Sequence, residues 1–453
     1  MKPSRNYLGT IIWWYAIMAV FLYTSIRDIG LSATELEFDS PIIGSLRGCD
    51  VAFALGAVWV GINHIKLGWL FRNRLIIPYA TIVSLFAAIG LLRSGAGVFF
   101  NNDIRVWLML PLGAVLGVMI HDTKYPLFHL ATMSIFLATI MAWATYRDPA
   151  SAYYSSPVGA LQRIVNINVY NCSAMLWSLG AYLLTIGLST GLRLPLLGGG
   201  IAILGQAIIA VISATRSMLG VLGVCLLFVV IVAVRLLPDP RRKFNRKVGL
   251  RVGLIALVVG LCALPYAGNI ATYSELLYIR TIGVTQESGE STDSRLAEIQ
   301  ALFNSFDMTD YLAGRGFGGR FPSPIYDNDL WPELHIGIFT FALKGGLGLM
   351  LLVMYVLLWE LPRRFVRAYF KSPDVRLPHD WGILLVTPMV YAPAMLLFLS
   401  GGYTTFTFLG WGIAYGAYVS NRKLLGSHIF PGHQHASVMP ALPVVQARLA
   451  GLR

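Results

Sequence analysis

Residues 195–236 read PLLGGGIAILGQAIIAVISATRSMLGVLGVCLLFVVIVAVRL, two apolar runs that are separated only by a short polar segment around Arg216. Each run has about the 20 residues that an α-helix needs to cross the hydrocarbon layer of a membrane. Similar runs recur along the chain of 453 residues, of which 56% are hydrophobic and 13% are charged. Soluble domains carry about 25% charged residues. We therefore predict an all-α fold, a polytopic bundle of membrane-spanning helices.

The apolar runs predict about twelve transmembrane helices. They cover residues 7–25, 48–65, 76–92, 105–120, 126–145, 169–187, 195–213, 217–236, 250–267, 336–358, 382–400 and 403–419. Lys and Arg residues gather near the N-terminus, in the connections at 235–251 and 363–376, and just after the last span. Because basic residues accumulate in short cytoplasmic loops, this pattern predicts that both termini lie in the cytoplasm. The net charge of +13 then reflects topology and contact with anionic lipids, and requires no nucleic-acid partner.

The predicted spans divide the chain into segments with different roles. These are a first helical segment, 1–267, an extracytoplasmic loop, 268–335, a second helical segment, 336–419, and a basic cytoplasmic tail, 420–453, which we expect to be disordered. The long loop, 268–335, is acidic, and loops of this length are usually functional. Within it, apolar side chains repeat at helical spacing over 294–306 and predict an amphipathic helix that begins near Arg295. The Cys residues fall mostly inside spans and indicate neither disulfides nor a zinc site.

A glycine turn, residues 312–320, follows the predicted amphipathic helix and reads LAGRGFGGR. It contains the Gly-x-Gly-x-x-Gly spacing of dinucleotide-binding loops. Such a loop needs a strand before it and a helix that begins at its third glycine, whereas coil is expected here. We therefore expect no nucleotide cofactor. The glycines either bring backbone N–H groups close to a phosphate or form a flexible turn, and the sequence favours neither.

Three other polar features lie near this turn or near the spans. Asp327-Asn328-Asp329 resembles the acidic motif by which soluble sugar transferases hold a metal, but in an acidic loop it is mostly expected to be a solvated turn. An arginine costs about 2.5 to 3.5 kcal/mol at a helix centre and less near a helix end, where Arg216 is expected, so Arg216 should face a wet cavity or a partner. Lys344 lies inside a predicted span, where it would snorkel, form a structural ion pair or contact a ligand.

Several features follow one another between residues 195 and 360. They are Thr215-Arg216-Ser217 between two spans, an amphipathic helix headed by Ser294-Arg295, the glycine turn, and His335 at the start of a Gly-containing span. This order resembles the O-antigen ligase and Wzy-type polymerase superfamily. Outside these residues the resemblance extends only to the number of spans. Many members carry Asn after the histidine, whereas this chain has Ile336.

The resemblance implies a GT-C-like membrane protein of the bacterial inner membrane. It implies an inverting, metal-independent glycosyltransferase that uses an undecaprenyl-pyrophosphate-linked oligosaccharide as donor, and it leaves room for a chain-length regulator protein as a partner. A polymerase would transfer the glycan to another lipid-linked glycan, and a ligase would transfer it to a lipid A core. Ile336 and the weaker likeness outside the central region favour the polymerase slightly.

The chemistry of such a transfer points to the basic residues of the long loop and its neighbours. Cleavage of a sugar–pyrophosphate bond develops negative charge, and guanidinium groups hold phosphate oxygens well, so we predict a clamp formed by Arg216 and Arg295. His335 is the candidate general base for the acceptor hydroxyl, although a lone histidine at a span end is often structural. We expect these residues to line a cavity that opens outward, and we expect no metal and no cofactor. Further candidates for substrate binding are Arg315, Arg320, Lys344 and Glu333, which is also the reserve base.

A transporter or flippase for lipid-linked glycans is the alternative function. About twelve spans with both termini in the cytoplasm is also a common transporter layout. Transporters are usually built from repeats whose broken helices meet at the middle of the membrane. This sequence shows no evident repeat, and its polar residues gather in the long loop, so we favour the enzyme.

Overall fold

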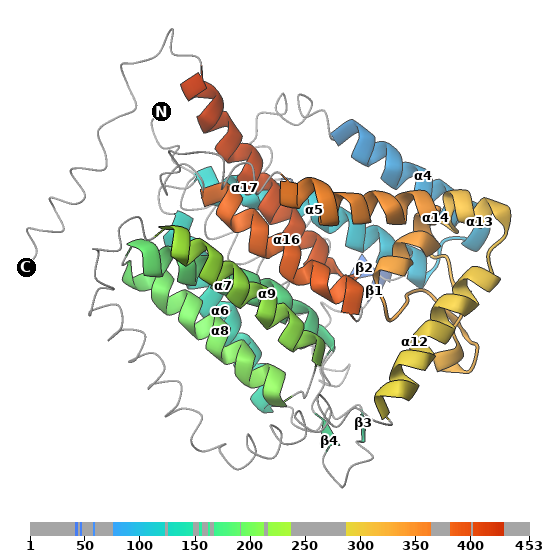
Figure 1. Ribbon diagram of the computed structural model, residues 1–453. Coiled ribbons are helices and arrows are strands. Elements are labelled where there is room, and N and C mark those ends of the chain that lie inside the picture. The colour runs from blue at the N-terminus through green and yellow to red at the C-terminus, as the bar shows by residue number, and fades with distance from the viewer. Residues whose placement is uncertain are drawn as a thin grey trace, which may run out of the picture.

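The computed structural model describes residues 41–43, 46–47, 58, 76–122, 126–147, 154–155, 162–163, 167–190, 192–212, 216–236, 287–363, 381–399 and 402–429. These residues are mostly helical (Figure 1). The α-helices are α4 (Ile76–Ser94), α5 (Val98–Asp122), α6 (Pro126–Arg147), α7 (Ile167–Thr190), α8 (Arg193–Ile212), α9 (Arg216–Leu236), α12 (Glu287–Asn304), α13 (Met308–Ala313), α14 (Ile338–Tyr355), α16 (Trp381–Leu399) and α17 (Thr405–Ile429). A 3-10 helix, η3 (Pro324–Tyr326), and a π-helical turn, η4 (Val356–Glu360), complete the helical elements of these ranges.

Short strands form antiparallel pairs. They are β1 (Pro41–Ile43) with β2 (Leu46–Arg47), β3 (Tyr154–Ser155) with β4 (Gln162–Arg163), and β5 (Phe321–Pro322) with β6 (Leu330–Trp331). The β5–β6 hairpin lies in the long loop, directly after the glycine turn. It is the strand pair that matters for the site.

The helical fold is confirmed for the described part of the chain. Every predicted span from 76–92 to 217–236, and every one from 336–358 onward, coincides with a helix. The predicted amphipathic helix is present as α12, but its predicted start near Arg295 is wrong, because α12 begins at Glu287. The predicted spans 7–25 and 250–267, and 48–65 apart from residue 58, lie outside the described residues. Because α17 continues to Ile429, the first residues of the predicted disordered tail are helical, and the rest of that tail lies outside the described ranges.

Two described helical segments, Ile77–Ser94 and Ile338–Arg363, are long and apolar enough to cross a membrane. Shorter apolar segments lie within α6, α7, α9 and α16. Much of the apolar surface of α4 and α14 is exposed, including Leu92 on α4 and Leu351 on α14. These helices support association of the chain with a membrane.

Helices α16 and α17 join two groups of helices. α17 packs along α5, and α16 packs against α7 and α9, while α6 and α8 pack with each other and with α7. Figure 1 shows α4, α5 and α14 on one side of α16 and α17, and α6 to α9 on the other. The helix α12 of the long loop lies at the edge of this arrangement.

Glycines bring α5 and α17 together at backbone distance. Gly113 and Gly117 of α5 face Gly412 and Gly416 of α17. A Cβ atom on Gly117 would lie only 2.1 Å from the Ile413 carbonyl oxygen. Each helix thus has the Gly-x-x-x-Gly spacing that lets helices approach closely inside membranes.

Helix α14 is interrupted near its start. Gly345 and Gly346 have φ angles of −134° and 71°, which do not continue a helix. Just before the break, the carbonyl oxygens of Leu343 and Lys344 accept hydrogen bonds from the backbone N–H groups of residues 315 and 316, at 2.7 and 3.0 Å. In an apolar setting an unpaired carbonyl group is costly, so the glycine turn supplies partners that the broken helix lacks.

The glycine turn is also fixed against α4 and α5. Phe317 donates its backbone N–H to the Phe86 carbonyl oxygen of α4 at 3.0 Å. Its side chain is fully buried among the rings of Phe86, Phe100 and Trp107. Gly90 of α4 permits this contact, because a Cβ atom there would lie 2.1 Å from the Phe317 carbonyl oxygen.

Gly90→Ala should destabilise the protein by about 1–3 kcal/mol, because the added methyl group overlaps the backbone of the glycine turn. Gly223→Ala is the matched control, since Gly223 also lies inside a helix but a Cβ atom there meets nothing within 4 Å. The control should be neutral or stabilising by up to about 1 kcal/mol. Thermal unfolding in detergent measures both effects. Equal midpoints for the two variants would contradict the close approach of α4 and the turn.

Candidate functional site

The site is built around one face of α12. Arg295 and Glu298 are separated by one helical turn and therefore lie on the same side of this helix. Arg295 Nη1 donates to the Leu399 carbonyl oxygen at the C-terminal end of α16, at 3.1 Å. The Glu298 side chain is only 1% exposed. This face of α12 thus packs against the C-terminal end of α16 and against the segment that leads into α14.

His335 lies against Glu298. Its Nδ1 atom is 3.3 Å from the Glu298 carboxylate, and its backbone N–H donates to Glu298 Oε2 at 2.8 Å. Ser323, directly after β5, donates its hydroxyl to Glu298 Oε1 at 3.0 Å. The imidazole side chain is 34% exposed. A carboxylate that is buried therefore holds a histidine that is partly accessible.

A small apolar cluster keeps α12 in this position. Four side chains are buried together: Leu302 of α12, Phe321 of β5, Leu334 in the segment before α14, and Leu343 of α14. Leu302 lies one turn after Glu298, so the same helical face that carries the polar contacts continues into this cluster. The apolar cluster therefore aligns Glu298 with the segment that holds His335.

Arg216 is the first residue of α9, and its side chain lies outside the described part of the chain. Its helix nevertheless reaches the same place. Gly220, one turn after Arg216, is packed against Leu399, because a Cβ atom on Gly220 would lie 2.8 Å from Leu399 Cδ1. Leu399 also provides the carbonyl oxygen that binds Arg295. The beginning of α9, the end of α16 and the Arg295 face of α12 therefore meet.

Lys344 forms a buried ion pair. Its Nζ atom lies 2.6 Å from Asp103 Oδ2 of α5, with both side chains almost completely buried. It also donates to the Gly319 carbonyl oxygen at 3.0 Å, and Asp103 accepts from the backbone N–H of Gly318 at 2.7 Å. Of the alternatives for Lys344, the structural ion pair is the one observed. Tyr403 lies beside this cluster, and its hydroxyl group accepts a hydrogen bond from Trp107 Nε1 of α5 at 2.8 Å.

Glu333, the reserve base, lies near this ion pair. Burial of its carboxyl group raises the pKa of Glu333 to about 7, and the Asp103 carboxylate adds to the increase, while Lys344 opposes it. At neutral pH a substantial share of Glu333 is therefore protonated. Its charged neighbours, Asp103 and Lys344, belong to the contacts that join the long loop to α5 and α14.

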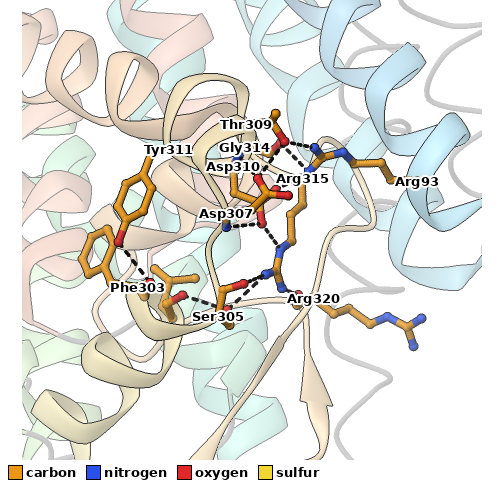
Figure 2. A network of polar contacts seen from close by, with 11 residues as sticks. Arg93, Phe303, Ser305, Asp307, Thr309, Asp310, Tyr311, Gly314, Arg315 and Arg320 are labelled. Carbon is orange, nitrogen blue, oxygen red and sulfur yellow. Dashed lines mark hydrogen bonds and ion pairs between the residues drawn. The ribbon is translucent and has the colours of Figure 1, made fainter.

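Arg315 belongs to a second polar network (Figure 2). Asp310 of α13 binds Arg315 Nε at 3.0 Å and also pairs with Arg93 at the end of α4. Arg315 donates in addition to the carbonyl oxygens of Arg320 and Ser305. These donors connect separate parts of the chain, so the structure gives Arg315 internal partners in place of an open position for substrate.

Arg320 is exposed, and Figure 2 shows its guanidinium group directed away from the Arg315 network. Its Cζ atom lies 5.7 Å from the centre of the Phe99 ring, a cation–π contact. Within the described ranges no carboxylate pairs with it. Of the two further arginine candidates, Arg320 is thus the exposed one, whereas Arg315 is held by internal partners.

The glycine turn does not present an anion site. Each backbone N–H from residue 314 to residue 319 already has an acceptor within the protein. The acceptors are the carbonyl oxygens of Asp310, Leu343, Lys344, Phe86 and Gly316, and the side chain of Asp103. Neither the phosphate-binding turn nor the flexible turn describes this segment, because its donors are used to join the loop to α4, α5 and α14.

The acidic triplet forms the turn of the β5–β6 hairpin, as expected. Asp327 and Asn328 have positive φ angles of 52° and 65°, a conformation that Asp and Asn tolerate better than most residues. Asn328 and Ser323 are joined by a backbone hydrogen bond of 2.9 Å. Among the described residues, no three His, Cys, Asp or Glu side chains are grouped as metal ligands would be.

The sequence interpretation missed three acids that organise the site. Glu298 has a usable signal, because it lies one turn after the predicted clamp residue Arg295. Asp103 lies at the edge of an apolar span, and an acid in such a position is a marker for a functional or paired group. Asp310 has only the Asp307-x-x-Asp310 spacing of a capping box, which points to the start of α13 and not to Arg93.

No protein-family model, curated protein or solved structure matches this chain. The functional argument therefore rests on the residues and on the contacts described above.

The Asp103–Lys344 pair should behave as a coupled unit. Lys344→Met or Asp103→Asn alone should destabilise the protein by about 3–5 kcal/mol, because each leaves a buried charge without its partner. The double variant should be more stable than the sum of the two losses predicts. Thermal unfolding of the four proteins measures this coupling. Additive losses would show that the two charges do not interact.

Glu333 should make the stability depend on pH. Because its folded pKa of about 7 lies above the ordinary 4.5, the folded protein keeps a proton that the unfolded chain loses. Stability should therefore fall as the pH rises from about 4.5 to about 7. Glu333→Gln cannot titrate, so its unfolding midpoint should change less across this window. Identical pH profiles for the variant and the unchanged protein would contradict the raised pKa.

Proposed function

We propose that this chain is a polytopic membrane glycosyltransferase of about twelve spans, with both termini in the cytoplasm. It transfers or polymerises a glycan from an undecaprenyl-pyrophosphate-linked donor at the outer face of the bacterial inner membrane. The observation that carries the proposal is the convergence of Arg295, Glu298 and His335 on one face of α12, at the place where α9 begins with Arg216.

The contacts of the long loop support a site at one face of the membrane. The loop touches Arg93 at the C-terminal end of α4, Phe99 at the N-terminal end of α5, and Leu399 at the C-terminal end of α16. These ends lie on the same side if the helices cross a membrane alternately, as the basic connections predict. A lipid-linked donor keeps its pyrophosphate at the level of the headgroups, which is where such a site would meet it.

The proposed roles follow from the charges of the reaction. The bond between the anomeric carbon and the pyrophosphate oxygen breaks, and a bond from the acceptor oxygen to that carbon forms with inversion. Arg295 and Arg216 stabilise the negative charge on the departing lipid pyrophosphate. His335 takes the proton from the acceptor hydroxyl. Arg320, which is exposed on the same loop, contributes to binding of the anionic donor.

Polymerase and ligase differ in the acceptor and share this chemistry. A polymerase uses a second lipid-linked glycan, and a ligase uses a lipid A core. We favour the polymerase, because Ile336 stands where many members carry Asn and because the likeness is weak outside residues 195–360. The acceptor test below separates the two.

The break in α14 favours a transporter as the second candidate, because discontinuous helices often carry transport sites. The polar groups at this break are already satisfied, however. The carbonyl oxygens of Leu343 and Lys344 accept from the glycine turn, and the Lys344 ammonium group is paired with Asp103. The break therefore has the contacts of a structural junction, and we prefer the enzyme.

Purified protein in detergent micelles should still transfer the donor glycan and release lipid pyrophosphate, because bond formation needs no second compartment. His335→Ala should lower turnover by about 10² to 10⁴ with donor binding nearly unchanged. Arg295→Ala should weaken both binding and turnover, since its guanidinium group contacts the pyrophosphate throughout. Product formation with each acceptor, followed by mass spectrometry, measures these effects.

Arg363→Ala is the matched control for the arginine variant, because Arg363 is exposed at the far end of the α14–η4 segment from the site. It should retain full turnover. Folded protein that binds donor but forms no product with either acceptor would overturn the enzyme and favour the transporter.

A further inference from the structure

Glu298 is a buried carboxylate that does not take part in the proposed transfer directly. It lies one turn after Arg295 on α12, and its oxygens face Ser323 and His335. A carboxylate inside a protein is retained only when its acceptors are satisfied. Here the two carboxylate oxygens of Glu298 accept hydrogen bonds from Ser323 and from His335, the proposed base.

We infer that Glu298 is the positioning residue for His335: it holds the imidazole with the proton on Nδ1 and makes Nε2 the nitrogen that accepts the acceptor proton. This inference rests on the proposed function for its catalytic meaning. The orientation of the ring, however, can be tested without any assay of activity.

The hydrogen-bond chemistry determines the tautomer. An ionised carboxylate is an acceptor only, so a neutral imidazole whose Nδ1 faces it must carry its proton on that nitrogen. In this tautomer the lone pair is on Nε2. The distance of 3.3 Å from Nδ1 to the carboxylate and the partial exposure of the ring fit this arrangement.

Two contacts from one carboxylate fix both the backbone and the ring. The His335 backbone N–H donates to Oε2 at 2.8 Å, and this bond holds the main chain of His335 next to α12. Ser323 holds the other oxygen at 3.0 Å and limits rotation of the carboxylate. Because Arg295 lies on the same helix as Glu298, α12 connects this arginine of the clamp to the base.

A purely structural role for Glu298 is the alternative, in which it only anchors the chain before α14. Glu298→Gln separates the two roles. The amide oxygen can still accept from the His335 backbone, while the amide N–H₂ group donates to Nδ1 and favours a proton on Nε2. An imidazole with its proton on Nε2 cannot accept the acceptor proton there, as known for hydrolase histidines whose carboxylate is replaced by an amide.

The test is ¹⁵N NMR of histidine-labelled protein in micelles at alkaline pH, where imidazoles are neutral. The His335 signals are identified by their loss in His335→Gln. The unchanged protein should show the Nδ1–H tautomer, and Glu298→Gln should shift the population towards Nε2–H.

In the transfer assay, Glu298→Gln should lower kcat by about 10² to 10⁴ and change KM for the donor by less than about threefold. Glu298→Asp should restore part of the turnover.

Gln300→Glu is the matched control, because Gln300 is exposed on the same helix and has no place in the contacts of Glu298. It should keep the Nδ1–H tautomer and most of the turnover. An Nε2–H tautomer in the unchanged protein would overturn the inference, and this measurement does not depend on whether any Glu298 variant folds. Equal His335 signals in the unchanged protein and a folded Glu298→Gln variant would also overturn it. A tautomer switch in a protein that transfers no glycan would support the positioning of His335 while removing the proposed function.

Discussion

The structure depends on the junction between the glycine turn and the interrupted helix α14. The backbone N–H groups of Arg315 and Gly316 bind the carbonyl oxygens of Leu343 and Lys344, next to the break at Gly345. An apolar environment gives these carbonyl groups no water, so their partners must come from the protein. The long loop is therefore part of the helical bundle, joined to it by hydrogen bonds that the break requires.

Charge reinforces the same junction. Lys344 is fully buried, and its pairing with Asp103 ties α14 to α5, while Asp103 also binds the backbone of Gly318. Within the loop, the buried Asp310 joins Arg93 of α4 to Arg315 (Figure 2). These internal ion pairs account for part of the charge in and around the loop, which is high for a chain in which 13% of the residues are charged.

This anchoring gives the proposed site its rigidity. The apolar cluster of Leu302, Phe321 and Leu334 holds α12 against the hairpin and the start of α14. Glu298 and Arg295 are presented from that helix towards His335 and towards Leu399. In the proposed transfer, base and clamp then have a fixed separation, which favours reactions that need two groups to act on one bond.

The sequence by itself determined the helical character of the chain and the approximate limits of its described helices, because apolar runs and their interruptions are local properties. It also marked Arg295 and His335, since these residue types are unusual beside apolar spans. Only the tertiary structure decided the partners. Glu298 meets His335, and Lys344 meets Asp103, across contacts that join distant segments, and no local pattern specifies which acid lies opposite which base. The same holds for the glycine turn, because no pattern in the sequence shows that its N–H groups bind carbonyl oxygens next to the break in α14.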